Sequence, residues 1–131
     1  MTTELNMLVL TAILTALLWV PYILAHIVTN GLVPALTYAA DGHPLPDWAA
    51  RLKKAHTNAI ENLPIFAVAV LVAHAIGVST EVTVLAAQAY LGARILHAIG
   101  YASNLPLART LTFAVGWAAT FAIFWEIFAS M

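Results

Sequence analysis

The sequence predicts an all-α integral membrane protein in which four spanning helices form one domain over residues 1–131. Composition supports this, because 63% of the residues are hydrophobic and only 8% are charged, against about 25% charged in soluble domains. The mean hydropathy is +0.91. In addition, four segments are each long enough to cross about 30 Å of hydrocarbon. A soluble bundle would need a polar outer stripe on every helix, and the first and fourth segments have none.

The first predicted helix covers about residues 5–28 and contains Pro21, where we expect a kink. Its apolar run from Met7 to Ile27 is longer than the roughly 7–15 apolar residues of a secretion signal, and no basic residue precedes it. We therefore interpret it as a retained span. The other three helices are expected at about 48–76, 82–101 and 106–129.

Residues typical of helix ends lie between these segments. Asp47 is expected to cap the second helix and Gly77 to end it. The connection after Gly77 is short, so the second and third helices should be antiparallel neighbours. The candidates for the other two helix starts are, in chain order, Ser79, Thr80, Ser103, Asn104 and, in the first turn of the fourth helix, Pro106.

Charged residues near the helix boundaries sort by connection. Basic residues lie beside the first and third connections, and acidic residues lie near the two termini and at the second connection. The basic residues are Arg51, Lys53, Lys54 and Arg109, and the acidic residues are Glu4, Glu81 and Glu126. Because basic residues mark the cytoplasmic side, both termini are expected on the non-cytoplasmic side. The net charge of −1 gives no reason to expect nucleic-acid binding.

The second helix carries polar residues below the membrane surface. About twenty residues counted back from its end, at about 1.5 Å each, reach Thr57, so Asn58 and Glu61 lie inside the hydrocarbon. The same count puts Arg94 of the third helix at a similar depth. We expect an ion pair between Glu61 and Arg94, because an unpaired charge there would cost at least about 2.5–3.5 kcal/mol. The pair would either only hold the bundle together or belong to a binding site.

Three helices present polar or aromatic stripes at this end. Their members are three or four residues apart, which places them on one helix face. The stripes are Arg51, Lys54, Asn58, Glu61 and Ile65 on the second helix, Tyr90, Arg94, His97 and Tyr101 on the third, and Arg109, Thr112, Phe113 and Gly116 on the fourth.

Arg109 opens the fourth helix without an obvious acidic partner, since Asp41 and Asp47 are the only candidates nearby. It is either a lipid-facing side chain that reaches the headgroups or an anion-binding group. No metal site is expected, because the chain has no Cys and its His residues, His56 and His97 among them, show no His-x3-His spacing. Without Cys the protein also has no thiolate nucleophile of its own.

The string AHTNAIENLPIF, residues 55–66, resembles the second-helix signature of the MAPEG family, the membrane-associated proteins in eicosanoid and glutathione metabolism. That signature has the form A-H-x-N-x-x-E-N, preceded by basic residues and followed by Pro and an apolar run. The string ARILHAIGYASNLPLART, residues 93–110, resembles the family's third-helix Arg, the Tyr seven residues later and the Arg that opens the fourth helix. The resemblance covers the whole chain, and the short bacterial members look most similar.

The resemblance implies a homotrimer in a bacterial inner membrane, with sites between adjacent subunits that face the cytoplasm. It implies that glutathione is the co-substrate and that the other partners are the lipid bilayer and a lipophilic small-molecule substrate. Arg109 matches the catalytic Arg associated with the glutathione thiolate. The glutathione-binding positions are matched by Lys54, His56, Asn58, Glu61, Arg94 and Tyr101.

The predicted function is therefore that of a membrane-bound glutathione-dependent transferase or peroxidase acting on lipophilic electrophiles or hydroperoxides. The chemistry is consistent, because a guanidinium favours the thiolate of a thiol whose ordinary pKa is about 8.5.

The sequence departs from the family pattern at Thr57 and Lys54, where Arg is common, and at Phe113, which is Tyr in some members. A second hypothesis is thus a MAPEG-fold membrane protein that binds another amphiphile or a lipid without transferase activity. A third is a small transporter or a structural membrane protein. A transporter would favour broken midplane helices and a repeat, and the sequence shows neither beyond Pro21.

Overall fold

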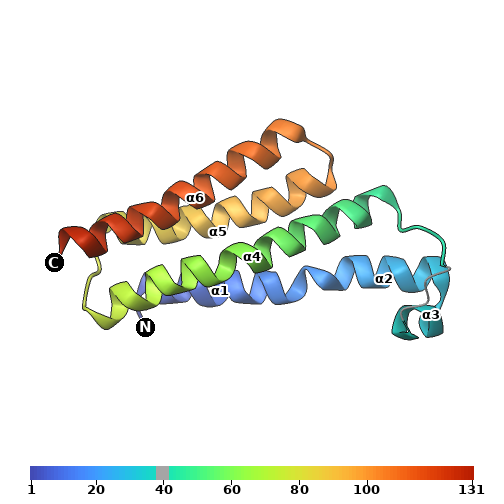
Figure 1. Cartoon of the computed structure of the whole chain (residues 1–131), viewed down its shortest axis with the longest axis horizontal. Coiled ribbons are helices and arrows are strands. Elements are labelled where there is room, and N and C mark those ends of the chain that lie inside the picture. Colours follow the sequence, from blue (N-terminus) through green and yellow to red (C-terminus); the bar gives the residue numbers. More distant parts are fainter. Residues whose placement is uncertain (38–41) are drawn as a thin grey trace.

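A computed structural model describes residues 1–37 and 42–131 and shows an elongated helical bundle (Figure 1). The helices in these residues are α1 (Thr3–Leu17), α2 (Trp19–Asn30), α3 (Leu32–Thr37), α4 (Asp47–Ala75), α5 (Glu81–Ala102) and α6 (Pro106–Ala129). α1 and α2 together form one span, and with α4, α5 and α6 they give four helices long and apolar enough to cross a membrane. The predicted all-α fold with four spans is confirmed.

The first span is interrupted at Leu18, between α1 and α2. Pro21 explains the position, because proline has no N–H to donate to the carbonyl oxygen four residues earlier, on Leu17. The interruption expected at Pro21 is therefore present, three residues earlier in the chain. The sequence did not predict α3, a helix of 6 residues that follows Gly31 in the first connection. Gly31 has a φ of 88°, a left-handed backbone conformation that favours glycine.

α4 begins at Asp47, one residue before the start expected from the sequence. Pro46 is the N-cap residue and makes no side-chain capping bond, and Asp47 is the first helical residue. The prediction that Asp47 caps this helix is therefore wrong. A carboxylate in the first turn is still favourable, because it lies at the positive end of the helix dipole.

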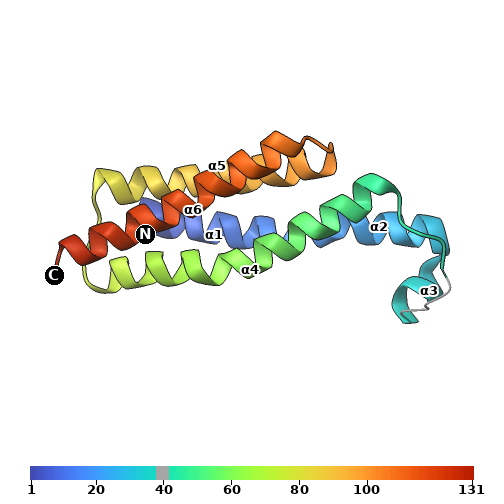
Figure 2. The same cartoon turned by 45° about the horizontal axis from the view of Figure 1, so that its top comes forward.

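The α4–α5 turn has the geometry of a Schellman motif, which satisfies the last carbonyl groups of a helix. The Val78 N–H donates to the Ala73 carbonyl at 2.8 Å, and the Gly77 N–H donates to the His74 carbonyl at 3.2 Å. Gly77 has a φ of 76°, as the prediction that it ends the second helix requires. The turn makes α4 and α5 antiparallel neighbours (Figures 1 and 2).

The starts of α5 and α6 differ in how they are capped. Thr80 caps α5, since its hydroxyl accepts from the Thr83 N–H and the Thr83 hydroxyl accepts from the Thr80 N–H. At α6 the N-cap is Leu105, without a side-chain bond, so the prediction of Ser103 or Asn104 as cap is wrong. Asn104 instead ends α5: its φ is 59°, which asparagine tolerates better than most residues.

The core lies among α4, α5 and α6 and contains many alanines. Small residues let helices approach closely, which is how membrane helices gain packing energy. Within the core, Phe66 stacks on Tyr90 with ring centroids 3.8 Å apart. Large apolar side chains are exposed on α1, α2 and on the outer faces of α4, α5 and α6. These exposed faces suit contact with lipid tails rather than water.

Candidate functional site

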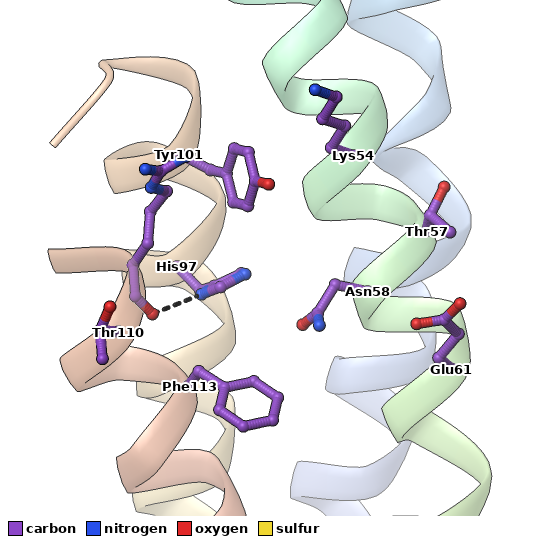
Figure 3. Close-up of a pocket in the computed structure, with 9 residues that line it drawn as sticks. Lys54, Thr57, Asn58, Glu61, His97, Tyr101, Thr110 and Phe113 are labelled. Atoms are coloured by element: carbon purple, nitrogen blue, oxygen red, sulfur yellow. Dashed lines mark hydrogen bonds between the residues drawn. The ribbon is translucent and has the colours of Figure 1, made fainter. Parts of the chain in front are cut away.

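A pocket of about 550 Å³ opens between α4 on one side and α5 and α6 on the other (Figure 3). Its lining residues on α5 and α6 lie near the turn between these helices, and that turn lies away from both termini (Figure 1). We call this the pocket end and the opposite end, with both termini and the α4–α5 turn, the terminal end. The pocket is lined by Lys54, Thr57, Asn58, Glu61, His97, Tyr101, Arg109, Thr110 and Phe113.

The α4 wall carries Lys54, Asn58 and Glu61, which are four and three residues apart and so share a helix face. Asn58 is half-buried and points toward α5, whereas Lys54 and Glu61 are exposed (Figure 3). Thr57 also lines the pocket, but its hydroxyl donates to the Lys53 carbonyl at 3.1 Å. That back-bond occupies the only proton of the Thr57 hydroxyl.

The opposite wall is built by the α5–α6 turn. The Leu105 N–H donates to the Gly100 carbonyl at 2.9 Å, and the Asn104 N–H donates to the Tyr101 carbonyl at 3.1 Å. Gly100 is required for close approach, because a Cβ there would lie 3.0 Å from the Cβ of Ala108. The turn thus brings the first residues of α6 beside the last two turns of α5.

Arg109 lies over Tyr101, with its guanidinium carbon 4.8 Å from the ring centroid. A cation over an aromatic face gains roughly 0.5–2 kcal/mol. The side chain is half-buried and lines the pocket, so it is not simply a lipid-facing group. Asp41, one of its two candidate partners, lies outside the described residues. Asp47, the other, is exposed at the start of α4.

Arg94 lies beneath the pocket rather than in its lining, and only 4% of its surface is exposed. Its Nη1 donates to Asn58 Oδ1 at 2.9 Å. The expected pairing with Glu61 is therefore wrong. The rotation of α4 about its axis explains this. Asn58 faces Arg94 on α5, whereas the Glu61 side chain, three residues later, lines the pocket.

The site of the Arg94 guanidinium depends on α6. A Cβ added to Gly116 would lie 2.7 Å from Nη2 of Arg94, so any larger residue there would displace the guanidinium. The guanidinium carbon is also 5.2 Å from the centroid of Tyr90 and 5.9 Å from that of Phe113. Arg94 thus contacts α4, α5 and α6 next to the pocket and holds the Asn58 amide in place.

The sequence-based set of site residues omitted four lining residues, Thr57, His97, Thr110 and Phe113. Of these, His97 is the one with a titratable side chain. Its Nδ1 lies 3.2 Å from the Arg109 carbonyl oxygen and 3.1 Å from Thr112 Oγ1. The Thr112 hydroxyl donates to the Ala108 carbonyl at 2.6 Å, so both neighbours of Nδ1 act as acceptors. This assigns the hydrogen to Nδ1 and leaves Nε2 as an acceptor, buried and without a partner among the described residues. The sequence feature that could have identified His97 is its spacing from Arg94 and Tyr101, which places it on the same face of the third helix.

His56 lies away from the pocket. It is two residues from Asn58, and helix residues two apart do not face each other. Its Nδ1 is hydrogen-bonded to the Tyr22 hydroxyl at 2.8 Å, which ties α4 to α2. Of the seven site residues expected from the sequence, the pocket therefore brings together Lys54, Asn58, Glu61, Tyr101 and Arg109, with Arg94 below it and His56 outside it.

The fold and the pocket define the class of protein: a four-span membrane bundle with a polar cavity at one end, whose walls carry two cations, a carboxylate and an imidazole. The MAPEG family model matches residues 6–129, and the chain belongs to this family of membrane proteins of glutathione and eicosanoid metabolism. No curated protein and no solved structure matches the chain.

Proposed function

We propose that the protein is a membrane-bound transferase or peroxidase that uses glutathione against lipophilic electrophiles or hydroperoxides. The observation that carries this proposal is the charge arrangement of the pocket. Lys54 lies on the α4 wall and Arg109 on the α6 wall, with Glu61 deeper along α4 (Figure 3). This set complements a small zwitterion that has more carboxylates than ammonium groups.

Glutathione has that chemistry, with two carboxylates, one ammonium group and one thiol. Lys54 and Arg109 supply cations for the anionic groups, and Glu61 supplies a carboxylate for the ammonium group. The Asn58 amide and the Tyr101 hydroxyl add neutral hydrogen-bonding groups. The cavity of about 550 Å³ falls in the range of roughly 300–1,000 Å³ typical of small-molecule sites.

In the proposed mechanism Arg109 stabilises the thiolate, because a nearby guanidinium favours the charged form of a thiol. Arg109 also lies in the first turns of α6, where the helix dipole favours an anion. The thiolate sulfur then attacks the electrophilic carbon of a substrate dissolved in lipid, and a thioether forms as the leaving group departs.

We further propose that the pocket faces the cytoplasm of a bacterial inner membrane and that the protein works as a homotrimer. The basic residues support the orientation, because those near helix boundaries, including Arg51 and Lys53, belong to the pocket end. The openness of the pocket in a single chain supports the oligomer, since a neighbouring subunit would close it.

One observation favours the second function, binding of another amphiphile without transferase chemistry. Thr57 stands between the two polar turns of α4, and its hydroxyl is committed to the Lys53 carbonyl. It therefore offers no donor to a glutathione carboxylate. Lys54 and Arg109 are then the only cationic side chains among the described residues that line the pocket.

The discriminating experiment titrates glutathione into the purified protein in detergent and follows heat release, thiolate absorbance and conjugation to an aryl halide. Saturable binding with thiolate formation supports the transferase. S-methylglutathione is the matched control, because it keeps both carboxylates and lacks the thiol. Absence of binding at millimolar glutathione would contradict the proposal and leave the amphiphile-binding function.

A further inference from the structure

A second polar cluster lies at the terminal end, far from the glutathione pocket. Its centre is Glu4, a carboxylate in the first turn of α1 that is only 5% exposed. The Ser79 hydroxyl donates to Glu4 Oε1 at 2.8 Å, and the Thr83 hydroxyl lies 2.6 Å from the same oxygen. The cluster therefore joins α1 to the start of α5.

The other carboxylate oxygen, Oε2, is buried and has no hydrogen-bond partner among the described residues. A buried carboxylate is costly unless both oxygens are hydrogen-bonded or the charge is paired, and only Oε1 is bonded here. No ion pair with Lys, Arg or His reaches Glu4 in the described part of the chain. All five Lys and Arg residues lie at the pocket end or in the middle of the bundle.

Glu4 also lines a cavity of about 250 Å³, together with Thr2, His74, Gly77 and Ser79 and with apolar residues of α4. One water in the liquid takes about 30 Å³, so this cavity is large enough for a small organic group. The C-terminal end of α4 forms one wall, and the helix dipole is negative there. His74 is exposed on that wall. The Glu4 carboxylate and the end of α4 favour a positively charged occupant, and the N-terminal ends of α1 and α5 stabilise the carboxylate itself.

We propose that this cavity binds a primary ammonium group, which donates a hydrogen bond to Glu4 Oε2. A metal ion fits less well, because the described residues contain no group of three His, Cys, Asp or Glu side chains that could hold one. Glu126, another carboxylate at the terminal end, accepts a hydrogen bond from the Thr80 hydroxyl at 2.8 Å. Since α1 begins at Thr3, the cavity lies at the depth of lipid headgroups. The ammonium group belongs either to a phosphoethanolamine headgroup or to a soluble amine.

The test measures thermal unfolding of the purified protein in detergent with increasing ethylammonium chloride. Tetramethylammonium chloride at equal ionic strength is the control, because it has the same charge and no N–H donor. Ethylammonium should raise the Tm saturably, since a ligand that binds only the native state stabilises it, and tetramethylammonium should not. Equal Tm values in the two salts would overturn the proposal.

Two variants localise the effect. Glu4→Gln removes the charge and should abolish the difference between the two salts. Glu81→Gln, at an exposed carboxylate of the same end, should preserve it. A difference that survives in Glu4→Gln would also overturn the proposal, and the comparison of salts in the unaltered protein stands even if that variant does not fold.

A lipid arm separates the two sources of the ammonium group. Protein in nanodiscs of phosphatidylethanolamine is compared with protein in phosphatidylcholine, with Glu4→Gln measured in both. A higher Tm in phosphatidylethanolamine that Glu4→Gln removes identifies the headgroup. An ethylammonium effect without this lipid dependence identifies a soluble amine. None of these measurements depends on glutathione.

Discussion

The two ends of the bundle differ in how their charged side chains are arranged. At the pocket end cations gather around an open cavity, and Arg94, the one buried cation there, reaches only the neutral amide of Asn58. At the terminal end a carboxylate is buried under hydroxyl groups. The pocket end thus carries two cations and one carboxylate for a zwitterionic ligand, whereas the buried group at the terminal end is a carboxylate alone.

The largest expected effect removes a cation from the pocket. Arg109→Ala should lower the rate of aryl halide conjugation by about 100-fold, because one donor to a developing or bound anion is worth about 10²–10³ in rate. Thiolate absorbance should fall more than glutathione affinity. Arg109→Lys, which keeps the charge, is the control. Equal losses of thiolate and affinity would show that Arg109 only positions the ligand.

A change at the terminal end should act on stability alone. Thr83→Val removes a hydroxyl beside the Glu4 carboxylate and one half of the α5 capping box. Loss of a hydrogen bond to a charged group costs about 1.5–3 kcal/mol, which thermal unfolding in detergent would register as a lower Tm. Glutathione binding should stay unchanged. A weakened glutathione affinity would show that the two ends are coupled.

Gly116→Ala tests the close packing of Arg94 against α6, next to the pocket. The new Cβ would lie 2.7 Å from Arg94 Nη2 and would push the guanidinium away from Asn58, so overpacking should cost about 1–3 kcal/mol. The matched control is Gly92→Ala, where an added Cβ meets nothing within 4 Å. Unfolding of both variants in denaturant measures the difference. Similar stability of the two would refute the close packing of Arg94 against α6.

Glu61→Gln tests whether Glu61 forms an ion pair with Arg94. Because Glu61 is exposed and Arg94 bonds to Asn58, the stability should change by no more than about 0.5 kcal/mol. Glutathione affinity should fall by about tenfold, or about 1.4 kcal/mol, since an ammonium group loses its partner. Calorimetric titration and thermal unfolding give the two numbers. A large loss of stability would restore the structural ion pair.

Tyr22→Phe should have the smallest effect. It deletes the hydroxyl that is hydrogen-bonded to His56, and a single neutral hydrogen bond contributes about 0.5–1.5 kcal/mol. Glutathione affinity is expected to stay the same, because His56 lies outside the pocket. If His56→Gln or Tyr22→Phe weakened glutathione binding, His56 would belong to the site, as the family resemblance implies.

Local chemistry explains why the helices were predictable. A long apolar run must be helical in a membrane, because the backbone polar groups find no water there. Gly77 was readable as a helix end, since glycine adopts a positive φ at little cost. The start of α6 was not readable, because Asn104 suits both a cap and a left-handed turn. α3 is too short to leave a periodic signal.

The sequence by itself determined the membrane class, the four spans and the stripes at helical spacing, because hydropathy and periodicity are properties of consecutive residues. Only the tertiary structure decided which stripe residues meet. The rotation of α4 gives Asn58, not Glu61, to Arg94 and turns His56 toward Tyr22. The packing of the other helices likewise places His97 in the pocket and buries Glu4 beside Ser79 and Thr83. Spacing fixes the face of a helix, but contacts depend on how the helices rotate against one another.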